Sequence, residues 1–252
     1  MNNRIGEKNI NNFGSEMIIT GYRNNKDIDI YFPEYDWTAQ NATYDNFKNR
    51  RIKCPYERSV FDKGYLGEGK YQAKIKNKIT RQYNAWVQMI RRCYDPKLHA
   101  NHPTYEECTV NEEWLNFQNF AKWYDENYYE ISKQKTDLDK DILTKGNKIY
   151  GPSTCVFIPH NINVLFIKRN KTRGKHPIGV TYKKQNKKYQ AYCNKGTGEL
   201  KHLGYYDTPE EAFEAYKIYK ENLIKEIANK YKNQIPDKLY RALLNYEVEI
   251  TD

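Results

Sequence analysis

The segment 208–211 constrains the fold of this chain more than any other short stretch. Thr208 is followed at once by Pro209 and, three residues on, by Glu211. This is the spacing of a capping box, in which the threonine and glutamate side chains satisfy backbone N–H groups at the start of a helix. Apolar residues then recur at helical spacing: Ala212, Ala215, Tyr216, Tyr219, Leu223 and Ile227. The pattern predicts a helix that begins near 209 and needs an apolar surface to cover.

The residues just before this helix are predicted to supply that surface as a three-stranded sheet. Two alternating runs flank residues 185–187, and a Gly-Thr-Gly turn at 196–198 precedes a third short strand. Since side chains alternate between the two faces of a strand, we expect a face toward the helix made of Val180, Tyr182, Tyr189, Ala191, Cys193 and Leu203. The outward face is then polar, basic and aromatic, with Thr181, Lys183, Gln190, Tyr192, Asn194 and His202.

The charge of the chain is positive and unevenly distributed. The 252 residues carry a formal net charge of +10 and 24 tyrosines, a combination that suits a polyanion with stackable bases. Residues 45–92 hold thirteen Lys and Arg against four acids, and residues 168–175 hold five basic residues and no acid. A lysine-rich surface that only keeps the protein soluble is the alternative. The uneven distribution favours a partner.

Cysteine content and hydropathy predict the cellular compartment of the protein. Five cysteines, an odd number, follow an N-terminus without a secretory leader, which predicts an intracellular, cytoplasmic protein of a bacterial host or a phage-infected cell. No apolar run approaches the length of a membrane span, so we expect no membrane partner.

The periodicities predict an α+β chain built from several small modules. Residues 1–80 are expected to form a β-rich basic module, 81–170 a mixed α/β domain, and 176–252 the sheet and helix described above, with 168–175 as a basic linker. In the first module, the basic run 47–59 either touches phosphates or forms a solvated edge. Two helical stripes of the middle domain are expected in the core: Tyr83, Trp86, Ile90, Cys93, Trp114, Phe117, Phe120, Trp123 and Tyr124.

The C-terminal segment resembles the plant Apetala-two (ethylene-response-factor) DNA-binding domain over about sixty residues. The resemblance is carried by Gly179-Val180, Tyr189 to Ala191, Leu203-Gly204, Thr208, Glu210-Glu211-Ala212 and Ala215-Tyr216. It implies three antiparallel strands in the major groove, a helix packed behind them, and DNA contacts at Thr181, Lys183, Tyr192, Asn194 and His202. None of these five keeps the family's residue type, so the family's GC-rich target is not implied. Lys183, Lys184, Lys187 and Lys188 are predicted phosphate contacts. The alternative is a unit used for packing or protein contact.

The middle segment resembles degenerate phage HNH endonucleases. The resemblance is carried by Tyr83, Trp86, Met89, Arg92 and Cys93, then by 138–141, Asn147, Tyr150, Pro152 and Cys155. It implies a general-base histidine after the first strand, but Lys140 occupies that place, and a protonated lysine is a poor base near pH 7. Asp139, Asp141, His160, Asn161 and Asn163 are candidates to hold Mg²⁺ or Mn²⁺ and a water. Alternatively, the aspartates serve a turn, His160 lies on the surface and Asn161 caps a helix.

A third set of residues has the composition of a zinc site. Cys93, His99, His102 and Cys108 are spaced Cys-x5-His-x2-His-x5-Cys, and two thiolates with two imidazoles suit tetrahedral zinc. The usual knuckle of two closely spaced cysteines is missing. Two half-buried cysteines flanking a loop with exposed histidines form the alternative that we favour.

These patterns favour a double-stranded DNA-binding protein of phage or prophage type, which reads DNA with its C-terminal sheet; no cofactor is assigned to this role. A metal-dependent homing endonuclease of HNH type is the second hypothesis, and Mg²⁺ or Mn²⁺ would then be its cofactor. The third is a protein-binding antagonist of a host defence that uses its tyrosine-rich surface. Salt dependence separates the first two from the third, because contacts of several lysines with phosphates release counterions.

Overall fold

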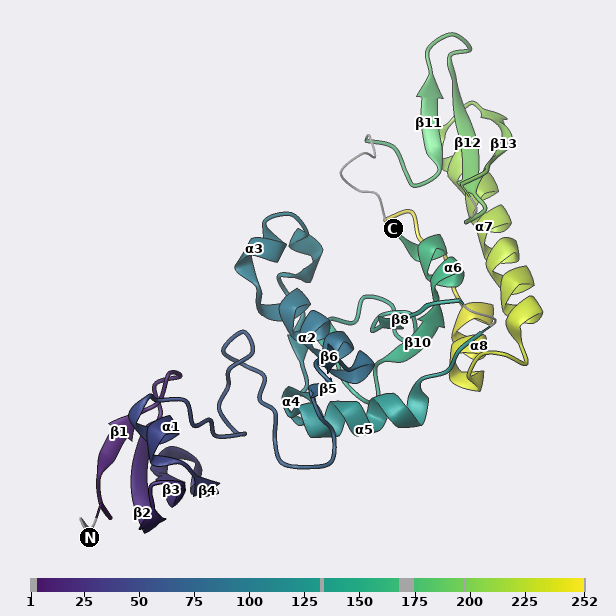
Figure 1. Cartoon of the computed structure of the whole chain (residues 1–252). Helices are drawn as coiled ribbons and strands as arrows, with labels where there is room; N and C mark the ends of the chain where they lie inside the picture. Colours follow the sequence, from purple (N-terminus) through teal and green to yellow (C-terminus); the bar gives the residue numbers. More distant parts are fainter. Residues whose placement is uncertain (1–3, 132–133, 168–174, 197, 252) are drawn as a thin grey trace. The chain divides into compact units, whose positions relative to one another are not determined.

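The computed structural model describes residues 4–131, 134–167, 175–196 and 198–251, so the predicted basic linker at 168–175 lies outside the described residues except for Lys175. Helices alternate with several small sheets, which confirms the predicted α+β class (Figure 1). The chain divides into two compact units, one of Met1–Glu126 with Lys148–Pro152 and the other of Asn127–Asn147 with Ser153–Asp252. This division runs through the predicted middle segment, because Ile149–Tyr150 (β9) pairs in parallel with Thr109–Val110 (β7).

The first unit begins with a four-stranded antiparallel sheet. Its strands are β1 (Lys8–Ile10), β2 (Glu16–Asn24), β3 (Asp27–Phe32) and β4 (Trp37–Ala42), paired in sequence order. The 3-10 turn η1 (Pro33–Tyr35) joins the last two strands, and the short helix α1 (Tyr44–Lys48) follows them. A core forms from Phe47 of α1, from Cys54 and from alternate residues of β2 and β3, which are Met17, Ile19, Ile28, Ile30 and Phe32. The strand alternation predicted for residues 1–80 is therefore present in β2 and β3.

Helices carry the rest of the first unit. They are α2 (Arg81–Tyr94), α3 (Pro96–His99), η2 (Pro103–Tyr105), α4 (Glu112–Leu115) and α5 (Phe117–Asn127), and a small hairpin of β5 (Lys74–Ile75) with β6 (Lys78–Ile79) precedes α2. The buried Trp86 donates from Nε1 to the carbonyl oxygen of Trp114 at 2.7 Å. The predicted aromatic stripes are buried or half-buried, and Tyr83 contacts Phe117 edge-on at 5.3 Å between ring centroids.

The second unit opens with a two-stranded hairpin and a helix. Strand β8 (Thr136–Asp139) pairs antiparallel with β10 (Val156–Pro159), so that Asp137 lies opposite Ile158. The chain then turns directly into α6 (His160–Asn163) and the 3-10 turn η3 (Val164–Phe166). Strand β10 is buried along its whole length, and its last residue, Pro159, pairs with Thr136, so that the first residue of α6 lies beside the start of β8.

The C-terminal part of this unit has the predicted sheet and helix. Strands β11 (Val180–Lys183), β12 (Lys188–Asn194) and β13 (Leu200–Tyr206) form an antiparallel sheet in sequence order. Helix α7 (Pro209–Tyr231) lies behind it (Figure 1), and its capping box is formed by the Thr208 and Glu211 side chains. The predicted inward residues Val180, Ala191 and Cys193 are buried with three helix residues, Ala212, Phe213 and Tyr216. Tyr182 is the exception at 39% exposed, although its ring packs on Tyr189.

Helix α7 is longer than the sheet needs. Its 23 residues span about 35 Å. The second half carries Ile224, Ala228 and Tyr231 into a separate core, together with α8 (Asp237–Leu244) and the hairpin of β8 and β10. One continuous helix therefore belongs to both cores of the second unit. None of the helices in the described ranges is both long and apolar enough to cross a bilayer.

Candidate functional site

The outward face of β11–β13 holds the residues that the sequence places there. Thr181 lies opposite Gln190 and Lys183 opposite Lys188 in one pair of strands, and Tyr192 lies opposite His202 in the other. A β-bulge between Ala191 and Tyr192 shifts the register, so that Tyr205 pairs with Gln190. The backbone alternation thus brings the predicted DNA contacts Thr181, Lys183, Lys188, Tyr192, Asn194 and His202 onto one face, opposite helix α7.

The side chains of this face contact one another. Nε2 of Gln190 lies 3.0 Å from Nδ1 of His202, and the His202 ring is 4.8 Å from that of Tyr205 between centroids. Asn194 accepts the backbone N–H of Gly196 at 2.8 Å, which fixes the start of the glycine turn. The face therefore combines hydrogen-bonding groups with exposed rings. Gln190 and Tyr205 complete it, although only Gln190 was expected there.

The turn between β11 and β12 concentrates the positive charge. Lys184 and Lys187 lie within it, and Lys183 and Lys188 flank it on the two strands. Lys188 pairs with Asp207 at 3.1 Å, whereas Lys183, Lys184 and Lys187 have no acidic partner among the described residues. Residues 180–206 contain six Lys and one Glu, and residues 207–252 contain seven Lys and Arg and ten acids. The sheet segment is thus basic and the helical segment behind it is acidic.

The hairpin and helix of β8, β10 and α6 bring together a second group of polar side chains. Nδ1 of His160 lies 2.6 Å from Oδ2 of Asp137, and Asn163 donates from Nδ2 to the same oxygen at 3.2 Å. The backbone N–H of His160 donates to the carbonyl oxygen of Lys135 at 2.9 Å. The Asp137 side chain is 16% exposed and that of His160 is 59% exposed. A largely buried carboxylate therefore orients an imidazole that solvent can reach.

The electrostatics of Asp137 keep its carboxylate ionised. Partial burial alone would raise its pKa, but hydrogen bonds from His160 and Asn163 outweigh burial, and the pKa is lowered. Lys135 adds an ammonium 3.6 Å from the other carboxylate oxygen. With Nδ1 of His160 donating to this carboxylate, the neutral imidazole presents Nε2 as a proton acceptor.

Asp139 and Asp141 lie in the turn that follows β8. Oδ1 of Asp139 accepts the backbone N–H groups of Asp141 and Ile142 at 2.9 and 2.7 Å. Burial, together with the nearby charge of Asp141, raises the pKa of Asp139 to about 6. The Lys140 ammonium lies 3.3 Å from Oδ2 of Asp141, and Asn147 donates to the Lys140 carbonyl at 2.7 Å. The Asp139 side chain therefore serves the turn, as one of the two sequence hypotheses has it, whereas the Asp141 side chain faces Lys140.

These side chains do not fit a magnesium or manganese site as they are arranged. The Asp139 carboxylate accepts two backbone hydrogen bonds, that of Asp141 faces an ammonium, and that of Asp137 is shared by His160 and Asn163. No group of three or more His, Cys, Asp or Glu in the described ranges is placed to hold a metal ion. Of the five candidates, His160 and Asn163 meet at Asp137, and Asp139 and Asp141 lie beside each other in the turn. Asn161 instead donates to the Tyr231 hydroxyl at 2.6 Å.

The four candidate zinc ligands are not brought together either. Nε2 of His99 lies 2.9 Å from the carbonyl oxygen of Arg92, and the Cys108 thiol donates to that of Thr104 at 3.7 Å. His102 instead packs its ring near Tyr105. Cys93 and Cys108 are buried and free of disulfides. Within the part of the chain that the structure describes, the set therefore forms no metal site.

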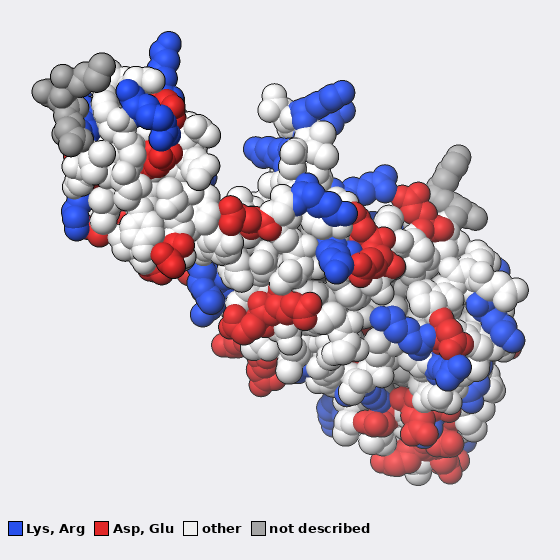
Figure 2. Space-filling view, turned by 90° about the horizontal axis from the view of Figure 1, so that it is seen from below, with Lys and Arg blue, Asp and Glu red and all other residues white. Residues whose placement is uncertain are grey.

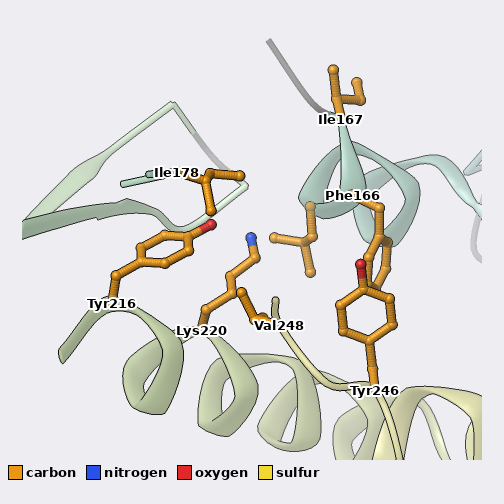
Figure 3. Close-up of a pocket in the computed structure, with 8 residues that line it drawn as sticks. Phe166, Ile167, Ile178, Tyr216, Lys220, Tyr246 and Val248 are labelled. Carbon is orange, nitrogen blue, oxygen red and sulfur yellow. The ribbon is translucent and has the colours of Figure 1, made fainter. Parts of the chain in front are cut away.

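A buried lysine of α7 was not singled out from the sequence. Lys220 is only 7% exposed, and its ammonium points into a small pocket beside the hydroxyl of Tyr216 (Figure 3). Apolar side chains form much of the wall: Leu165, Phe166, Ile167, Ile178 and Val248. Burial lowers the pKa of Lys220. Helical spacing places residue 220 four positions after Tyr216, on the inward stripe, and this was the signal that could have identified it.

Sequence reasoning also missed Asp137. Strand alternation could have identified it, because Asp137 and Asp139 are two residues apart and so lie on one face of β8. Comparison of the chain with protein-family models, with curated proteins and with solved structures finds no match. The resemblances to HNH endonucleases and to the Apetala-two domain remain predictions.

Proposed function

We propose that this protein binds double-stranded DNA through the outward face of β11–β13. One observation carries the proposal: polar, basic and aromatic side chains line one face of a three-stranded sheet whose other face is covered by α7. Lysines at the turn suit phosphates, which position a protein on the duplex without reading sequence. Gln190 and Asn194 lie on the central strand, and side-chain amides pair with adenine in the major groove.

The test is a titration of fluorescent duplexes with the full chain at several salt concentrations. Replacing Lys183, Lys184, Lys187 and Lys188 by alanine is expected to weaken binding to all duplexes. The slope of log K against log [salt] should become shallower by about 0.9 for each phosphate that the variant no longer neutralises. A control matched in charge replaces Lys122, Lys225, Lys230 and Lys232, which are exposed on the helix α5 and on or next to the helix α7. If the sheet variant keeps the affinity and slope of the parent, the sheet is not the reader.

Hydrolysis of phosphodiesters is a second candidate, favoured by the contact between Asp137 and His160. In this role Nε2 of His160 takes a proton from water, and the Asp137 carboxylate stabilises the imidazolium that forms. Nicking of supercoiled plasmid, measured with chelator and with Mg²⁺ or Mn²⁺ added, tests the proposal. Activity that falls by about 10²–10⁴-fold in His160→Ala supports it. An intact plasmid under all conditions rejects it.

A further inference from the structure

The hairpin of β5 and β6 is a two-stranded ribbon with all four strand residues exposed to solvent. Lys74 lies opposite Ile79 and Ile75 opposite Lys78, so each face of the ribbon carries one isoleucine and one lysine. Ile75 is 56% exposed and Ile79 is 58% exposed. Isolated two-stranded hairpins are marginal in water and gain by packing on another surface. The ribbon thus has two faces that suit contact with a partner.

The tip of the ribbon has a lysine at a position where the backbone conformation favours glycine or asparagine. The turn residues Lys76 and Asn77 both have positive φ, 47° and 62°, as a type I′ turn requires. Glycine and asparagine take this conformation at little cost, whereas lysine is strained by it. Lys76 thus places a positive charge at the tip of the ribbon, next to the strand lysines Lys74 and Lys78.

The base of the ribbon is held firmly. The backbone N–H of Thr80 donates to the Ala73 carbonyl at 3.0 Å, and the Thr80 hydroxyl donates to the Gln72 carbonyl at 2.9 Å. The same hydroxyl accepts the backbone N–H of Tyr83 and so caps α2. Just before the ribbon, the side-chain amide of Gln118 accepts the N–H of Tyr71 and donates to the Tyr71 carbonyl, each at 3.0 Å. The ribbon therefore projects from a fixed base.

The charge around the ribbon has one sign. Residues 69–94 contain seven Lys and Arg and no acid, and residues 45–92 contribute thirteen minus four, or +9, to the net charge of +10. Lys74, Lys76 and Lys78 have no acidic partner among the described residues. Figure 2 shows one face of the molecule, on which acidic and basic side chains are intermingled. The ribbon is thus a local cationic element of the chain.

We infer that the β5–β6 ribbon is a second contact element for duplex DNA and inserts into the major groove. That groove admits a two-stranded β-ribbon, whose two faces then meet the two walls. Lys74, Lys76 and Lys78 contact phosphates, and Ile75 and Ile79 contact apolar edges such as the thymine methyl group. The inference goes beyond the proposed function, because it places groove contacts in the first unit and rests on none of the sheet residues.

Two variants of the full chain separate charge from groove contact. Lys74→Gln/Lys76→Gln/Lys78→Gln is expected to lower the salt slope of duplex DNA binding by about 2–3. Ile75→Ser/Ile79→Ser keeps every charge and is expected to weaken duplex DNA binding by about tenfold at an unchanged slope. Its affinity for duplex RNA should equal that of the parent, because the deep, narrow major groove of RNA excludes the ribbon. Thermal melting checks that both variants fold.

The two proposals are tested separately by adding the ribbon substitutions to the Lys183/Lys184/Lys187/Lys188 alanine variant and repeating the titrations. If the ribbon variants bind more weakly and the sheet variant does not, the ribbon contact stands and the sheet proposal fails. If only the sheet variant binds more weakly, the ribbon inference is overturned. A serine variant that weakens DNA and RNA binding equally also overturns it, since the ribbon would then not be a groove element. A parent chain that binds no duplex overturns both.

Discussion

His160 and Asp137 are joined by a contact of 2.6 Å between Nδ1 and Oδ2, across 23 positions of the chain. The contact links the first residue of α6 to the middle of β8, and Asn163 donates to the same carboxylate oxygen. The carboxylate is largely buried and the imidazole largely exposed. The contact orients the ring, and the imidazole, at 59% exposed, stays open to a substrate or water.

Asp137→Asn is expected to lower the free energy of unfolding at pH 7 by about 1–3 kcal/mol, because a hydrogen bond to a charged group is removed. The pKa of Asp137 is lowered below its ordinary value of 3.8 in the folded state. The ionised carboxylate therefore adds to the free energy of unfolding above pH 3.8, and this contribution disappears as the pH falls below that value. Urea unfolding of parent and variant from pH 7 to pH 3 should show their difference shrinking. A difference that stays constant to pH 3 would contradict the assignment.

Asp139→Asn is expected to have the opposite pH dependence. The pKa of Asp139 is raised to about 6, so its favourable contribution is present below pH 3.8 and disappears as the pH rises through 6. The asparagine oxygen still accepts the two backbone N–H groups of the turn. The variant should therefore be more stable than the parent by about 1–3 kcal/mol at pH 7 and similar to it near pH 4.

A direct titration checks the cause of this shift. In NMR spectra the Asp139 carboxyl should titrate near pH 6 in the parent and lower in Asp141→Asn, since one negative charge is removed. Burial remains in the variant, so part of the shift should persist. An unchanged midpoint would show that Asp141 does not act on Asp139.

Lys220→Met is expected to stabilise the protein at pH 7 by about 1–2 kcal/mol, because a buried ammonium is replaced by an apolar side chain of similar length. The pKa of Lys220 is lowered by burial, so the unfolded state binds more protons between the folded and unfolded pKa values. The stability of the parent relative to the variant should therefore rise from neutral pH toward pH 10. Chemical unfolding at pH 7, 8.5 and 10 measures this, with Lys217→Met as a control at a half-buried position of α7.

Thr208→Ala removes the side-chain acceptor of the capping box and should cost about 1 kcal/mol. Because α7 belongs to both cores of the second unit, the substitution is expected to lower the midpoint of a single transition rather than detach the sheet alone. Hydrogen exchange distinguishes the two cases. Amides of β10 and β12 should lose protection together. Thr208→Ser, which keeps a hydroxyl, should retain most of the stability.

Local stereochemistry could be predicted from the sequence where neighbouring residues decide it. The capping box at Thr208 and Glu211 forms as expected, because a cap depends on four consecutive residues. Strand alternation placed Val180 and Ala191 in the core and Thr181 and Lys183 on the outward face, because period two follows from the extended backbone. The α+β class follows from the sum of such local patterns.

Only the tertiary structure decided which distant side chains meet. Asp137 is one acidic residue among 32, and nothing local to it indicates His160 as its partner. The zinc spacing of Cys93, His99, His102 and Cys108 suggested a cluster, but backbone carbonyls take up His99 and Cys108 instead. The second half of α7 joins a core that local periodicity does not reveal. Convergence of this kind depends on how buried segments pack against one another, whereas periodicity and capping depend only on neighbours along the chain.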